Sequence, residues 1–136
     1  MNTAAPSSTI LVVEDDDQVR ALVRTLLTSD GFRVIDARTG AEGLRLALEF
    51  DDRIDLLLSD MLLPEISGFD VAAQVKSRYP DMKVILMTGW VEGEIVQRCV
   101  SELGAAFLDK PFAPAKLRQM VREMLHTKTG VASSDN

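Results

Sequence analysis

The chain has 136 residues, a formal net charge of −6 from 21 acidic and 15 basic side chains, and one cysteine, Cys99. This length suits a single domain that buries roughly two-thirds of its extended-chain surface without disulfides or a structural metal. The negative charge repels a phosphate backbone, so we expect no nucleic-acid partner. A single cysteine excludes an internal disulfide, so we expect a reducing environment.

The rest of the composition predicts one folded unit that lies in the cytoplasm. Residues 1–8 and 127–136 are small and polar, so we expect disordered tails on either side of a domain at 9–126. No apolar run approaches the roughly 18 residues of a membrane-spanning helix, and the start of the chain lacks the charged and apolar regions of a signal peptide. We therefore expect a soluble, cytoplasmic protein without a membrane partner.

Strand-like and helix-like patterns alternate along the chain. Each short apolar run is followed by apolar residues at helical spacing: 10–13 then 19–27, 34–35 then 41–48, 54–58 then 71–75, 84–87 then 95–103, and 105–108 then 117–125. Thr39 and Glu42 stand at capping-box spacing before the second helix, and Gly104 can end the fourth in the left-handed conformation. The pattern predicts five strand-helix units.

This alternation predicts an α/β fold, a doubly wound five-stranded parallel sheet with helices on both faces. Parallel neighbours need crossover connections, and strands that are buried on both faces have continuous apolar runs. In such sheets, sites form beyond the carboxyl ends of the strands. We therefore looked for polar residues at those ends.

Acidic side chains end the first and third predicted strands. Glu14 and Asp15 follow the first run, and Asp60 follows the third. At about 5 Å and an effective dielectric of about 20, each like-charged pair repels by about 3 kcal/mol, so the cluster calls for a cation, and a hard divalent ion is the natural candidate. Asp16 and Asp17 are explained by the positive end of the following helix. Thr88 and Lys110 follow the fourth and fifth strands.

Four motifs in this order resemble the receiver domain of bacterial two-component response regulators, either stand-alone or from a hybrid histidine kinase. The motifs are Glu14-Asp15, residues 60–68, Thr88-Gly89 and Lys110-Pro111-Phe112. The match covers essentially the whole folded unit. The resemblance implies a flavodoxin-like sheet of order 2-1-3-4-5.

The resemblance also implies that Asp60 is the phosphoacceptor for a histidine kinase or a histidine phosphotransfer protein. Mg²⁺ would be held by Asp15, by Asp60 and by the backbone carbonyl of Leu62, while Glu14 would act through a water in the magnesium shell. A positioned carboxylate is a competent nucleophile, and phosphoryl transfer needs mainly alignment and charge neutralisation. The domain would promote changes at its own Asp60 and would not be a turnover enzyme on an external substrate.

By the same resemblance, Lys110 and Thr88 would contact the phosphoryl oxygens. The Lys110-Pro111 bond would be cis, as is typical of the family. Phosphorylation would draw in Thr88 and let Phe107 swing inward, which would change a surface formed by the fourth helix, fifth strand and fifth helix. That surface would bind a downstream protein target, and the domain itself would be a monomer or weak dimer.

Two residues depart from the family pattern. Phe107 stands where many members have tyrosine, and as an aromatic close to the core it also has a plain packing role. Trp90 lies two residues after Thr88, where it would be a lid over the site or a partner contact. With Leu62 it would crowd an attacking water, which predicts a long-lived aspartyl phosphate.

Two alternative functions are compatible with a fold of this class. A phosphorylation-independent interaction module on this fold would not need the acids, Thr88 and Lys110. A flavin or nucleotide enzyme of similar topology would need a phosphate cradle after the first strand, where this chain has carboxylates. Cys99 and His126 have no part in the mechanism, since one suits helix packing and the other a solvated chain end.

Overall fold

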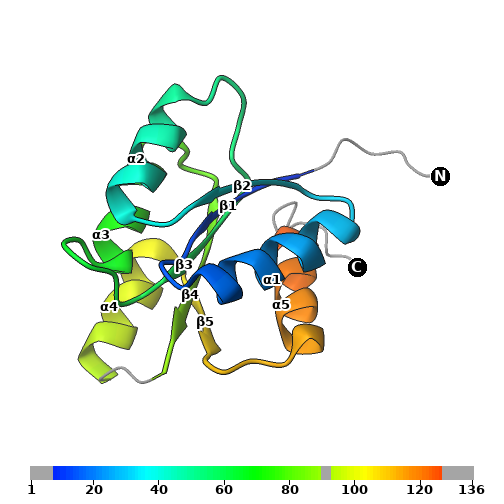
Figure 1. The fold of residues 1–136 in the computed structure, drawn as a ribbon. Coiled ribbons are helices and arrows are strands. Elements are labelled where there is room, and N and C mark those ends of the chain that lie inside the picture. Colours follow the sequence, from blue (N-terminus) through cyan, green and yellow to red (C-terminus); the bar gives the residue numbers. More distant parts are fainter. Residues whose placement is uncertain (1–7, 90–92, 127–136) are drawn as a thin grey trace, which may run out of the picture.

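The structure is a computed structural model that describes residues 8–89 and 93–126. Within these ranges, strands and helices alternate along the whole chain (Figure 1). The elements are β1 (Thr9–Val13), α1 (Asp17–Ser29), β2 (Arg33–Ala37), α2 (Gly40–Glu49), β3 (Leu56–Asp60), α3 (Gly68–Arg78), β4 (Lys83–Thr88), α4 (Gly93–Leu103), β5 (Ala106–Asp109) and α5 (Pro114–His126). Of the two predicted tails, only Ser8 falls within the described residues, so that prediction stays a prediction.

The five strands form one parallel sheet in the order β2-β1-β3-β4-β5, which confirms the predicted fold class and strand order. The register brings the carboxyl ends of the strands to one edge. Val13 at the end of β1 is aligned with Ala37 and with Ser59, and Asp60 at the end of β3 is aligned with Met87. The residues that follow β1 therefore lie at the same edge of the sheet as Asp60, the last residue of β3, and Thr88, the last residue of β4.

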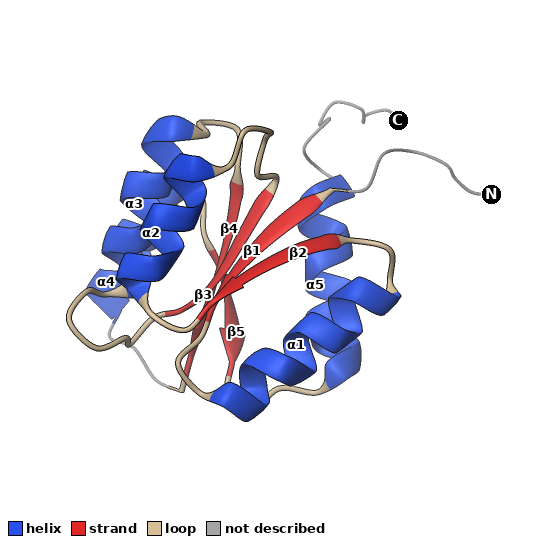
Figure 2. Ribbon diagram, turned by 45° about the horizontal axis from the view of Figure 1, so that its top comes forward, coloured by secondary structure: helices blue, strands red, loops and turns tan. Residues whose placement is uncertain are grey.

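The sheet is covered on both faces, because successive side chains of a strand point to opposite sides. Leu11 and Val13 pack into the core under α2, α3 and α4, whereas Ile10 and Val12 pack into the core under α1 and α5. Figure 2 shows α2, α3 and α4 on one side of the sheet and α1 and α5 on the other. The double burial explains why the strands have uninterrupted apolar runs.

The strand ends differ from the prediction in an informative way. β3 begins at Leu56 and ends on Asp60, two residues later at each end than the apolar run suggested, and β4 ends on Thr88, one residue past its apolar run. Asp60 and Thr88 are thus the last residues of their strands, held by the parallel pairing with Met87 and Asp109. Backbone pairing continues past the apolar residues, so the side chains of Asp60 and Thr88 project from paired residues of the sheet.

The helix ends follow the expected capping chemistry. Thr39 caps α2 by accepting from the Glu42 amide at 3.0 Å, and the Glu42 carboxylate accepts from the Arg38 amide at 2.9 Å. Gly104 follows α4 with φ of 65°, the left-handed conformation that was predicted. Across residues 8–89 and 93–126, every helix is too short or too polar to span a lipid bilayer.

Candidate functional site

Three carboxylates gather at the carboxyl edge of the sheet. Glu14 and Asp15 follow β1, Asp60 ends β3, and one oxygen atom from each lies within 4.8 Å of the other two. Glu14 and Asp60 are buried, and Asp15 is exposed. The strand pairing of β1 with β3 brings the two acidic segments together, as the sequence predicted from their positions.

Lys110 lies against two of these carboxylates. Its Nζ atom is 2.9 Å from Glu14 Oε1 and 3.0 Å from Asp60 Oδ2. Burial raises the pKa of Glu14, the hydrogen bond from Lys110 opposes this, and the charge of Asp60 adds to the rise. Burial by itself would lower the pKa of Lys110, but the hydrogen bonds to Glu14 and Asp60 outweigh it, so that pKa is raised. The lysine is held as a cation between the two acids.

The segment after β5 positions this lysine. The Lys110 amide donates to the Thr88 carbonyl at 3.0 Å, which continues the pairing of β4 with β5 beyond Asp109. The Lys110-Pro111 peptide bond is cis, as the resemblance implied. Thr88 is buried at the end of β4. The last residue of β4 and the lysine are therefore tied together through the main chain.

The loop between β3 and α3 is packed tightly against Asp60. The Gly68 amide donates to the Met61 carbonyl at 2.8 Å, and a Cβ atom on Gly68 would lie 2.2 Å from the Asp60 carbonyl oxygen. Only glycine permits this approach. The Leu62 amide lies 3.4 Å from Asp60 Oδ1, while its side chain is 74% exposed. The loop thus presents main-chain groups to Asp60.

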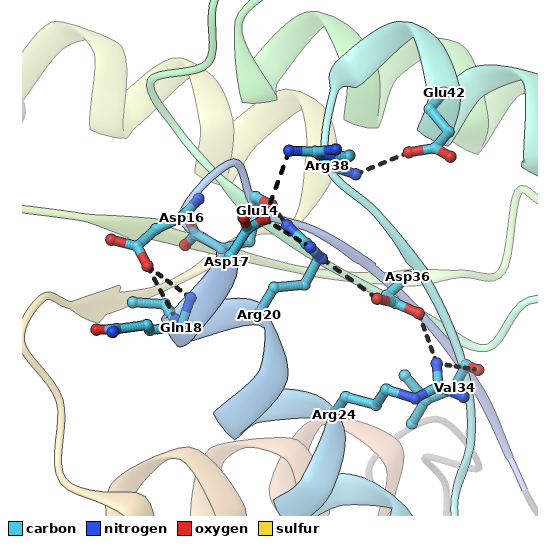
Figure 3. A network of polar contacts seen from close by, with 11 residues as sticks. Glu14, Asp16, Asp17, Gln18, Arg20, Arg24, Val34, Asp36, Arg38 and Glu42 are labelled. Carbon is cyan, nitrogen blue, oxygen red and sulfur yellow. Dashed lines mark hydrogen bonds and ion pairs between the residues drawn. The ribbon is translucent and has the colours of Figure 1, made fainter.

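The turn between β1 and α1 is held by contacts that sequence reasoning missed. Arg20 of α1 donates to the Glu14 carbonyl at 3.0 Å and pairs with Asp17 and with Asp36 of β2 (Figure 3). The Asp16 amide donates to Glu14 Oε2 at 2.9 Å. The spacing of Asp17 and Arg20 on one helix was visible in the sequence, but the link to Asp36 depends on the pairing of β1 with β2.

A comparison with protein families shows to which family the chain belongs. A family model described as the response regulator receiver domain matches residues 10–122. The chain belongs to the receiver domain family. The resemblance drawn from the four motifs is therefore confirmed.

Individual relatives agree with this family. The receiver domain is 34% identical over 119 residues to the sensor kinase CckA of Brucella abortus, covering 88% of this chain and 13% of the kinase. It spans about half or less of the length of several other curated relatives. The crystal structure of the receiver domain from the hybrid histidine kinase CckA is 32% identical, with a TM-score of 0.75, and the match covers 87% of this chain and 99% of that one. The chemotaxis protein CheY4 of Vibrio cholerae is 28% identical with a TM-score of 0.79, covering 88% and 100%.

The predicted switch residue Phe107 lies on β5, apart from the three carboxylates. It is aligned with Leu86 and half-buried against the core under α2, α3 and α4. Its packing is as expected, and its role as a switch stays a prediction. Trp90 lies outside the described residues, so its role as a lid or partner contact also stays a prediction.

Proposed function

We propose that this receiver domain accepts a phosphoryl group on Asp60 from a histidine kinase or a histidine phosphotransfer protein. The observation that carries the proposal is the position of Asp60, which ends β3 with one carboxylate oxygen held by Lys110 and with Glu14 and Asp15 close by. Carboxylates are seldom buried unless they are paired, and Asp60 lies at the edge where parallel α/β sheets form their sites.

The transfer is a displacement at phosphorus. An Asp60 oxygen forms a bond to phosphorus as the bond between phosphorus and the donor imidazole nitrogen breaks. The electron pair of that bond stays with the imidazole, which takes up a proton, so nothing is oxidised or reduced. Lys110 and the Thr88 hydroxyl are proposed to hold the phosphoryl oxygens, since this chemistry needs alignment and charge neutralisation more than covalent help.

The donor set at the site fits Mg²⁺. Three carboxylates within 4.8 Å of one another offer hard oxygen ligands, as this ion prefers. We propose that Asp15, Asp60 and the Leu62 carbonyl hold it, with Glu14 as an outer ligand. Bound there, the ion supplies positive charge to offset the negative charges that the acids and the phosphoryl group bring together.

Phosphorylation is proposed to change the surface of α4, β5 and α5. Thr88 would move toward the new anion and Phe107 would turn inward, and the altered surface would bind a downstream protein. We propose a cytoplasmic monomer or weak dimer that promotes phosphorylation and dephosphorylation of its own Asp60 and does not turn over an external substrate.

Incubation with a small phosphodonor tests this function. With Mg²⁺ present, intact-protein mass spectrometry should show one added phosphoryl group that hydroxylamine removes, as expected of an acyl phosphate. Chelation of the metal and the variant Asp60→Asn should each abolish the addition. Equal addition to Asp60→Asn would place the acceptor elsewhere, and no addition to the wild type would favour a phosphorylation-independent module.

A further inference from the structure

Arg20 makes three separate contacts around the turn that carries the metal-ligating acids. Its Nη1 atom donates to the Glu14 carbonyl at 3.0 Å, its Nη2 atom lies 2.8 Å from Asp17 Oδ1, and its Nε atom lies 3.3 Å from Asp36 Oδ2. Every nitrogen of the guanidinium is thus engaged (Figure 3). The Arg20 side chain is only 17% exposed, and its partner Asp36 is 27% exposed, whereas Asp17 is 65% exposed. The contacts with Glu14 and Asp36 are therefore better shielded from competing water than the contact with Asp17.

The contact with Glu14 bears directly on Asp15. The Glu14 carbonyl and the Asp15 amide belong to one planar peptide unit. A contact that fixes the carbonyl therefore also fixes the orientation of the Asp15 amide, where the Asp15 residue begins. In the preceding peptide unit, between Val13 and Glu14, the Glu14 amide donates to the Ala37 carbonyl of β2 at 3.1 Å. Arg20 therefore acts at the one peptide group that joins the two acids.

The other two contacts anchor the guanidinium itself. Asp36 lies on β2, beside β1 in the sheet, and Asp17 is the first residue of α1. A guanidinium is planar and presents its donors in a rigid fork, so partners on a strand and on a helix can hold it in one orientation. The two carboxylates, which also pair with Arg38 and Arg24, offset the positive charge of Arg20 as well as holding it in place.

We propose that Arg20 is a positioning residue that orients Glu14 and Asp15 for Mg²⁺. The inference rests on the proposed function, since it concerns the same metal site. Outer contacts of this kind hold metal ligands in place, and their loss typically weakens metal affinity by about tenfold or more. Arg20 touches neither the acceptor Asp60 nor Lys110 through the contacts above, so its effect should appear first in metal affinity.

Arg24 provides a matched control. It lies one helical turn further along α1, pairs with the same Asp36, and contacts the Val34 carbonyl at 3.5 Å (Figure 3). It therefore shares the residue type, the helix and one partner with Arg20, but its contacts lie on β2. A general tether between α1 and β2 would make the two arginines equivalent, whereas positioning of the acids requires Arg20.

The test is a titration of the full chain with MgCl₂, followed by the NMR shifts of the Asp15 and Asp60 amides. For Arg20→Ala, the dissociation constant should rise about tenfold, and for Arg24→Ala it should stay within about twofold of wild type. Arg20→Lys keeps the charge but has one nitrogen for three partners, so it should bind Mg²⁺ nearly as weakly as Arg20→Ala. If Arg20→Ala does not fold, Arg20→Lys alone decides.

The outcomes separate this inference from the function on which it rests. Wild-type affinity in Arg20→Ala or in Arg20→Lys would overturn the positioning role, and so would equal losses in Arg20→Ala and Arg24→Ala. A wild-type protein that does not bind Mg²⁺ at all would overturn the proposed metal site itself. Melting temperatures measured without Mg²⁺ give the reference for each variant.

Discussion

Lys110 contacts two of the carboxylates that are proposed to lie around magnesium, so we expect it to compete with the ion as well as to contact the phosphoryl group. Its Nζ atom contacts oxygens of Glu14 and Asp60 at 2.9 and 3.0 Å. In the structure this lysine therefore offsets the charge of both acids. Removing that cation leaves two adjacent acids uncompensated.

The variant Lys110→Ala should therefore bind Mg²⁺ more tightly while it accepts phosphate more slowly. Even at the dielectric constant of water, a unit charge and a divalent ion about 4 Å apart repel by about 2 kcal/mol. Because the lysine can move partly aside, we expect a dissociation constant lower by about threefold or more. Calorimetric titration with MgCl₂ measures it, with Lys116→Ala, an exposed lysine on α5, as the control. Weaker binding by Lys110→Ala would contradict this account of the site.

Gly68 is the residue on which the loop between β3 and α3 depends most. Alanine there would place Cβ 2.2 Å from the Asp60 carbonyl oxygen and 2.9 Å from Met61 Cα, both main-chain atoms that cannot rotate away. We expect Gly68→Ala to lose about 1–3 kcal/mol of unfolding free energy, measured by urea titration, and to slow phosphorylation because Asp60 is displaced. Gly93→Ala, where Cβ would meet nothing within 4 Å, should leave both unchanged. Full stability in Gly68→Ala would show that the loop adjusts freely.

The acids and the lysine of the site could be predicted from the sequence because each comes at the end of an apolar run. Arg20 could not, because its importance depends on Asp36, which lies 16 positions away and comes near only when β1 pairs with β2. The close approach of Gly68 to Asp60 likewise depends on the tertiary structure and is not visible in a local sequence pattern. Local patterns identify residues that carry chemistry, but they do not identify the residues that hold them.

At the scale of single elements, apolar runs located every strand but not its ends. β2 extends over Arg33–Ala37, whereas its apolar run contains only Val34 and Ile35. As an edge strand it is only partly covered, so polar side chains are tolerated along it. An apolar run marks where side chains are buried, whereas a strand is defined by main-chain pairing. The ends of the run therefore need not coincide with the ends of the strand.

The end of α4 offers a test at this scale. Gly104 has φ of 65°, and its amide donates to the Val100 carbonyl at 2.9 Å, closing the helix. Gly104→Ala should reduce the unfolding free energy by about 1 kcal/mol, because a Cβ atom is disfavoured in the left-handed region. Gly104→Asn should lose less, since asparagine enters that region more easily. Urea unfolding of both variants measures the difference, and equal stability of Gly104→Ala and wild type would contradict it.

For the molecule as a whole, alternation of strands and helices was enough to predict a parallel sheet covered on both faces. The strand order β2-β1-β3-β4-β5 came from the family resemblance, because alternation alone does not say which strand lies beside which. The order matters for function. It places β1 beside β3, and so brings Glu14 and Asp15 to Asp60.

Cys99 reports on the integrity of the whole fold. It lies on the core-facing side of α4 and is fully buried, and burial raises the pKa of its thiol, so the reactive thiolate is scarcer than in a free cysteine at any pH below that raised pKa. Native protein should therefore react with a thiol reagent far more slowly than free cysteine, and the rate should rise in step with urea unfolding. With a reagent that releases a coloured thiolate when it reacts, the absorbance of that product measures the rate. Rapid labelling before unfolding would show that α4 opens separately from the sheet.

The most direct test of the central claim is chemical trapping of the phosphorylated residue. Borohydride reduces an aspartyl phosphate to homoserine, so the chain is phosphorylated with Mg²⁺ and a small phosphodonor, reduced, digested and sequenced by mass spectrometry. The account predicts homoserine at position 60, and none there when the metal is chelated. Homoserine at position 15 instead, or an unreduced Asp60 in protein that carries the phosphoryl group, would contradict it.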